Sequence, residues 1–179
     1  WWQTPPTSPC RISNSGATGD IEESPALITP GPASPVETPW ACVSGVDLED
    51  QGTWVDFMRK VPGEARSEIA TKEADGSKQA ILHFRVLQRR AELTWLEIEL
   101  ETGRTHQIRL QCGTRGLPIV GDTLYGSELP FGLHHADQRR RCIALHARCL
   151  KIRHPMLDQD VEMTADLPSS WQDAEIALN

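Results

Sequence analysis

The sequence contains no run of about 18 apolar residues and no Cys-x-x-Cys pair. The first absence predicts that the chain has no transmembrane helix. Its five cysteines are an odd number, so we expect reduced thiols in a cytoplasmic protein, most of them acting as small buried apolar residues. The first 16 residues also lack the basic-then-apolar order of a secretory signal peptide.

Hydrophobic periodicity is absent from residues 1–39. This segment holds eight of the thirteen prolines, with serine, threonine and glycine between them. Its apolar residues follow neither the period of a helix nor that of a strand. We therefore predict a Pro/Ser-rich, disordered segment over residues 1–39, followed by one ordered domain over residues 40–179.

Lysine is scarce in the middle of the chain, where arginine is abundant. Residues 80–155 carry 12 Lys+Arg, eleven of them arginine, against 7 Asp+Glu, whereas residues 1–79 and 156–179 each have a net charge of −6. An arginine-rich face suits phosphate groups, so the middle of the chain could bind nucleic acid. The alternative is that these arginines only solvate strand faces. The run Arg139–Arg141 likewise fits either RNA phosphate contacts or a solvated loop.

The clearest periodic segments are strands. Residues 79–89 alternate between apolar and polar positions, and residues 92–101 alternate more cleanly, with leucine and isoleucine on one face and glutamate on the other. The short connection predicts that these two strands pair antiparallel, with Arg85 and Arg89 opposite the glutamates. Shorter strands are expected at 40–45, 142–152 and 162–167. The pattern predicts an α+β fold: a mixed, largely antiparallel sheet with short helices.

Two helices are expected beside this sheet. The first spans residues 105–113, with Thr105 as N-cap, Ile108 and Cys112 on one apolar face, and Gly113 at the end. The second is a final amphipathic helix over residues 171–178. Gly103 and Arg104 precede the first helix, and a glycine turn at a helix start is typical of an anion-binding site.

Three sequence blocks occur in a fixed order: GRTHQIR at residues 103–109, PIVGDTLYG at 118–126 and LHARCLKIRHP at 145–155. Together they resemble the C-terminal half of RluA-type pseudouridine synthases, whose pattern reads G-R-[TS]-H-Q-[IL]-R, P-I-[VL]-G-D-x-x-Y-G and L-H-A-x-x-L-x-[FI]-x-H-P. The segment WACVSG at residues 40–45 is similar to the family's Y-W-A-L-V-x-G strand. The resemblance covers residues 40–170.

The resemblance implies a reaction and its site. Such enzymes isomerise uridine to pseudouridine in structured RNA (rRNA or tRNA), with an aspartate central to breaking the glycosidic bond and with no metal or organic cofactor. The target base must leave its stack. Arg109 matches the arginine that pairs with that aspartate. The RNA-facing positions are Arg104, His106 and Gln107. The expected pocket wall comprises Ile108, Leu110, Gly121, Asp122 and Tyr125.

The sequence departs from the family in its first part. The catalytic-aspartate block, H-R-L-D-x-x-[TS]-S-G, has no counterpart in these 179 residues. Asp20 lacks His-Arg-Leu before it and Ser-Gly after it, so it is not assigned. Pro39 stands where the family has the tyrosine that packs on the target base.

These departures predict a partial catalytic domain that is inactive as this chain. The alternative is a non-catalytic RNA-binding or interaction module derived from the family. We also expect the strand at 40–45 to form an exposed sheet edge, because half of the family's sheet would be missing.

Histidine and cysteine gather near the C-terminus without indicating a metal site. The residues are His134, His135, Cys142, His146, Cys149 and His154. Two of them belong to the L-H-A and H-P elements of the third block, so we expect no metal. A Cys-His nucleophile pair is equally weak on these grounds.

Overall fold

The computed structural model describes residues 35–132 and 141–173. The Pro/Ser-rich segment up to residue 34 and the end of the predicted C-terminal helix lie outside the described residues. So do His134, His135 and most of the Arg139–Arg141 run.

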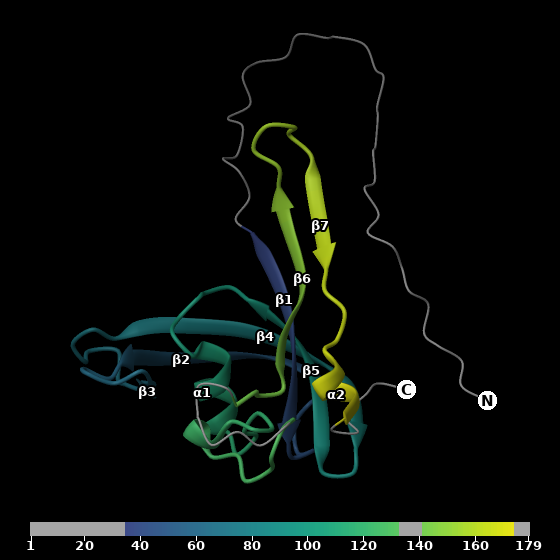
Figure 1. The fold of residues 1–179 in the computed structure, drawn as a ribbon. Helices are drawn as coiled ribbons and strands as arrows, with labels where there is room; N and C mark the ends of the chain where they lie inside the picture. The colour runs from purple at the N-terminus through teal and green to yellow at the C-terminus, as the bar shows by residue number, and fades with distance from the viewer. Residues whose placement is uncertain (1–34, 133–140, 174–179) are drawn as a thin grey trace.

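One seven-stranded sheet forms the body of the molecule (Figure 1). Its order is β3-β2-β4-β5-β1-β6-β7, and every pairing is antiparallel. The strands are β1 Val36–Ser44, β2 Gln51–Lys60, β3 Ser67–Ile69, β4 Lys78–Arg90, β5 Leu93–Leu100, β6 Leu145–Arg153 and β7 Asp160–Thr164. With the short helices described below, this architecture confirms the predicted α+β fold.

The β4–β5 hairpin has the pairing that the alternating pattern predicts. Leu82 and Phe84 are buried, and Arg85 lies opposite Glu97 with Nη2 2.5 Å from Oε2. Arg89 differs from the expectation, because it binds Asp50 and the carbonyl of Leu48 rather than a glutamate of β5.

Strand β1 lies inside the sheet, so the predicted exposed edge at residues 40–45 is wrong. It pairs with β5 on one side and with β6 on the other, and Ala41, Cys42 and Val43 have no exposed surface. The second neighbour comes from the C-terminal part of the chain, about a hundred residues away. β1 also begins at Val36, so the predicted boundary between residues 39 and 40 falls within a strand.

A short helix covers part of each face of the sheet. Helix α1 (Gln107–Gly113) places Leu110 against Met58 and Ala80. Helix α2 (Ser169–Asp173) places Trp171 4.8 Å from Trp95, measured between ring centroids. Trp95 points to the face opposite that of Leu96, because adjacent strand residues alternate. In Figure 1, α1 and α2 accordingly lie far apart on the two sides of the strands.

The N-cap of helix α1 lies one residue later than predicted. His106 occupies the N-cap position in a left-handed conformation (φ 56°), and no side chain caps the helix end, so Thr105 is not the cap. The apolar face is as predicted, with Ile108 and Cys112 both buried. Within the described residues, no helix is long and apolar enough to cross a membrane.

Candidate functional site

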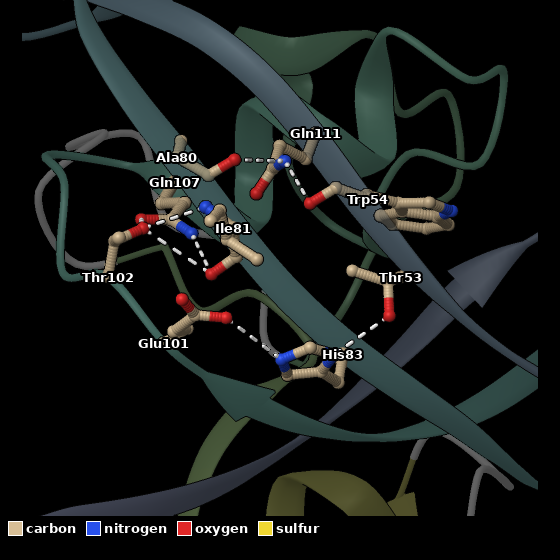
Figure 2. Close-up of polar contacts among 9 residues, drawn as sticks. All are labelled: Thr53, Trp54, Ala80, Ile81, His83, Glu101, Thr102, Gln107 and Gln111. Carbon is tan, nitrogen blue, oxygen red and sulfur yellow. Dashed lines mark hydrogen bonds and ion pairs between the residues drawn. The ribbon is translucent and has the colours of Figure 1, made fainter.

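The turn before α1 is held by the side chain of Gln107 (Figure 2). Its Oε1 accepts hydrogen bonds from Thr102 Oγ1 (2.9 Å) and from the backbone N–H of Arg104 (3.0 Å), and its Nε2 donates to the carbonyl of Ile81 in β4 (3.0 Å). Gln107 is only 3% exposed. The structure therefore gives this residue, expected to face RNA, an internal role: it fixes the Gly103–His106 turn to the sheet.

A second buried amide, Gln111, continues this attachment one turn later. Its Nε2 donates to Asp56 Oδ2 at 2.7 Å and lies 3.4 Å from the carbonyls of Trp54 and Ala80, as Figure 2 shows for the two carbonyls. Residues four apart share a helix face, so both glutamines point at the sheet. The sequence analysis did not predict this role. The only indication in the sequence was the spacing of the two glutamines, four residues apart on a predicted helix beside strands.

Arg109 and Asp122 form a forked ion pair next to that turn. Arg109 Nε and Nη2 lie 2.6 and 2.7 Å from the two carboxylate oxygens. The Asp122 side chain is 1% exposed and that of Arg109 is 20% exposed. The hydrogen bonds that Arg109 donates to Asp122 raise the pKa of Arg109 above its usual value. Such charge-assisted, two-point pairs fix the plane of the guanidinium, so Arg109 is held in one orientation by the chain itself.

His106 and Tyr125 complete a polar network around Arg109. Arg109 Nη1 donates to His106 Nε2 (3.0 Å), which assigns the proton to Nδ1, and Nδ1 donates to Tyr125 Oη (3.1 Å). Tyr125 Oη also accepts from the backbone N–H of Ser67 in β3 (3.0 Å). The Arg109 guanidinium lies 5.1 Å from the centre of the Tyr125 ring. Four side chains of two sequence blocks thus act as one unit.

The imidazole of His106 should make the protein less stable in mild acid. Burial, then the Arg109 charge, lowers the pKa of His106 below its usual 6.5, while Asp122 acts in the opposite sense. The unfolded chain therefore binds more protons than the folded one at and below about pH 6.5, and stability present above that pH is lost as pH falls through the lowered pKa.

We predict a drop in the free energy of urea unfolding between about pH 7.5 and pH 5.5. The drop should be smaller in His106→Asn, because asparagine also tolerates the left-handed backbone. Equal pH dependence in both proteins would contradict the assignment of a neutral His106.

The remaining predicted wall residues have different surroundings. Ile108 packs into the main core, whereas Leu110 packs with Met58, Ala80 and Tyr125. Gly121 has φ +86°, and a Cβ there would lie 2.6 Å from Cβ of Phe131. Glycine at position 121 is therefore required by backbone conformation and close packing.

Arg104 lies at the open side of the turn. Its Nε donates to the carbonyl of Gln79 (3.0 Å), and within the described residues no carboxylate forms an ion pair with it. Its own backbone N–H is taken by Gln107. The anion-binding feature of this turn is thus the Arg104 side chain, and α1, with seven residues, contributes little through its N-terminus.

Comparison with known proteins bears on the family of this chain. The sequence profile of the RNA pseudouridylate synthase family matches residues 34–114. Curated relatives include a ribosomal large subunit pseudouridine synthase D from Vibrio cholerae, 36% identical over 107 residues. These matches support an RluA-type pseudouridine synthase. An uncharacterized RNA pseudouridine synthase of Synechocystis sp. is 35% identical over 133 residues, 74% of this chain and 39% of that protein.

The chain spans about two fifths of the length of the curated relatives that it matches. It covers 39% of the protein from Synechocystis and 42% of an uncharacterized RNA pseudouridine synthase from Bacillus subtilis. Solved structures agree on the fold. Human RNA pseudouridylate synthase domain containing 4 has a TM-score of 0.58 at 20% identity, covering 79% of this chain and 62% of that one. Human RNA pseudouridylate synthase domain containing 1 has a TM-score of 0.57 at 24% identity, covering 78% and 58%.

Two other arrangements resemble catalytic groups but lack the required surroundings. Thr53 Oγ1 lies 2.8 Å from His83 Nδ1, and His83 Nε2 lies 3.3 Å from Glu101 Oε2 (Figure 2). The His83 and Glu101 side chains are 42% and 58% exposed on the open sheet, so we interpret this chain of contacts as cross-strand pairing. Burial raises the pKa of Cys42 and Cys112 to about 12, which makes both poor nucleophiles.

The described residues also bear on metal binding. Within residues 35–132 and 141–173, no three His, Cys, Asp or Glu side chains are grouped closely enough to hold a metal ion.

Proposed function

We propose that residues 36–173 form the arginine-bearing half of an RNA pseudouridine synthase site, and that this 179-residue polypeptide binds structured RNA (rRNA or tRNA) without isomerising uridine. The support for the site is the anchored guanidinium of Arg109. The support for inactivity is the sequence, which contains no H-R-L-D block and has Pro39 at the expected tyrosine position.

Arg109 still has donors for another acceptor. A guanidinium carries five N–H groups, and three are used by Asp122 and His106, which leaves two on Nη1 and Nη2. A carboxylate supplied by an H-R-L-D block could accept both. The positive charge would keep that carboxylate ionised and oriented, the role that the family resemblance implies for Arg109.

Without that carboxylate, the groups present can bind and orient RNA but cannot start cleavage of the glycosidic bond. Removing a residue that acts in the chemical step leaves only the stabilisation that binding provides. The alternative function, a non-catalytic RNA-binding module, has the same structural basis: a half-buried cation at Arg104 beside a rigid, partly buried network.

The test is RNA binding measured by fluorescence anisotropy, together with an assay for pseudouridine formation. We expect the wild-type chain to bind a structured, uridine-containing RNA, with affinity that falls as salt rises, and to form no pseudouridine. Arg104→Ala should weaken binding and reduce the salt dependence by about one phosphate contact. The matched control is Arg85→Ala, whose cation lies on the β4 strand and already pairs with Glu97.

Two results would contradict the proposal. Pseudouridine formation by the wild-type chain would contradict inactivity. Equal RNA affinity of wild type and Arg104→Ala at every salt concentration would remove Arg104 from the interface.

A further inference from the structure

A pocket of about 310 Å³ opens beside the Gly103–Thr105 turn, where β2 ends, β3 passes and β4 begins. We call it the β2–β4 basic pocket. The lining residues that matter here are Arg59, Lys60, Ser67, Lys78, Gly103 and Arg104. A Cβ built on Gly103 would meet nothing within 4 Å, so the backbone of the turn is open to a ligand at this point.

The charges that line this pocket are unbalanced. Arg59 is neutralised by Glu68, whose Oε1 lies 2.7 Å from its Nη2. In the part of the chain that the structure describes, no ion pair involves Lys60, Lys78 or Arg104. The nearby 71–77 turn carries Glu73 and Asp75, but neither lines the pocket. Like charges destabilise one another, so three gathered cations favour an anionic ligand.

The three cations are held on well-anchored backbone. Lys78 lies opposite Met58 in the β2–β4 ladder, and Lys60 lies opposite Ser67 in the β2–β3 ladder. Residues two apart on a strand share a face, so Lys60 and Met58 point to the same side, and Lys78 joins them. Met58 contacts Leu110, which identifies this side as the α1 face. Arg104 is fixed by the hydrogen bond from its Nε to Gln79.

The pocket is physically continuous with the Arg109 network. Ser67 Oγ donates to the carbonyl of Thr105 (2.7 Å), and the backbone N–H of Ser67 donates to Tyr125 Oη (3.0 Å). Ser67 is 2% exposed, so it is a buried link rather than a surface contact. The pocket therefore lies beside the network that contains Arg109.

We propose that the β2–β4 basic pocket binds a backbone phosphate of a nucleotide that flanks the target uridine, with Lys60 and Lys78 as contacts in addition to Arg104. This proposal rests on the RNA-binding function proposed above. Only Met58 among the lining residues is a large apolar side chain, and sites for small organic ligands are mostly apolar. The charge and the open backbone instead fit a phosphodiester, which binds through cations and carries no base identity.

The experiment measures RNA affinity over a range of salt concentrations for wild type and for Lys60→Ala with Lys78→Ala. Each phosphate contact on single-stranded RNA contributes about 0.7 to the slope of log K against log salt. The pocket holds one phosphate, so the double variant should lose up to about 0.7 from the slope. Its affinity should be lower at low salt and approach that of wild type at high salt. Lys60→Arg with Lys78→Arg keeps the charges and should keep the slope.

The matched control is Lys72→Ala with Lys151→Ala, which removes two exposed lysines that do not line the pocket. An unchanged slope in the pocket variant, while wild type binds RNA, would overturn the pocket and leave the proposed function standing. No binding by wild type would overturn the proposed function and the pocket with it.

A second arm separates an RNA phosphate from a free anion. Inorganic phosphate is titrated into the wild-type protein and the pocket variant, and amide chemical shifts of residues 60, 78 and 104 are followed by NMR. Weak phosphate binding that is lost together with the RNA slope supports the proposal. Phosphate binding that is lost while RNA binding is unchanged would make this a small-anion site and overturn it.

Discussion

Arg109→Met should lower the free energy of unfolding by about 3 kcal/mol. The substitution leaves the Asp122 carboxylate, only 1% exposed, without the two hydrogen bonds that now satisfy it. Removing one partner of a buried ion pair is costly because the other charge stays desolvated. The substitution also removes the hydrogen bond from Arg109 to His106 Nε2 and the contact between the guanidinium and the Tyr125 ring. A loss of this size is a large part of the stability of an ordinary domain.

Urea denaturation followed by circular dichroism measures this loss. Arg109→Met with Asp122→Asn removes both charges and should cost less than Arg109→Met alone, since no buried charge is left unpaired. Arg85→Met is the matched control on the surface: its pair with Glu97 has an arginine side chain that is 62% exposed, so the loss should be below about 1 kcal/mol. Similar losses of unfolding free energy for Arg109→Met and Arg85→Met would show that the buried Arg109–Asp122 pair stabilises the fold no more than a surface pair does.

Trp171→Ala should destabilise the fold by about 3–5 kcal/mol. Trp171 is 1% exposed and packs edge-on against Trp95 and Phe131, with ring centroids 4.8 and 5.6 Å away. Removal of the indole leaves a cavity between α2 and the sheet. Helix α2 spans only five residues, Ser169–Asp173, and a helix that short has no stability of its own. Its attachment therefore depends on this side chain.

The change is measured by urea unfolding, and by hydrogen exchange of the amides of residues 169–173, which should lose protection. Trp171→Phe, which keeps an aromatic ring, should recover part of the loss. Met156→Ala is the control, since Met156 is 85% exposed and its truncation should change stability by less than about 0.5 kcal/mol. A Trp171→Ala protein with wild-type stability would mean that α2 contributes nothing to the core.

The β4–β5 hairpin was predictable because its information is local. Alternation along each strand and a short connection fix both the pairing and the side that faces the core. The apolar face of α1 was predictable for the same reason, from the spacing of Ile108 and Cys112. The first residue of α1 was not predictable. His106 stands at the N-cap in a left-handed backbone conformation and without a side-chain cap, and the hydrophobic periodicity of a sequence does not indicate such a conformation.

The position of β1 shows the opposite case. Its sequence is apolar on both faces, which fits a buried strand, but the neighbour that covers its second edge comes from β6, far along the chain. The expectation of an open edge assumed that the second neighbour had to precede β1. Which distant strand pairs with β1 depends on how the backbone hydrogen bonds of the whole sheet are satisfied.

The sequence by itself determined the family, the alternating strands and the group of residues that includes Arg104, His106, Arg109, Asp122 and Tyr125. These follow from local periodicity and from motif blocks whose residues lie close together along the chain. Only the tertiary structure decided the roles within that group, because hydrogen-bond partners depend on distances in space. It places Gln107 inside the protein, pairs Arg109 with Asp122 through a fork, and brings Lys60 and Lys78 beside Arg104 from two strands that no motif connects.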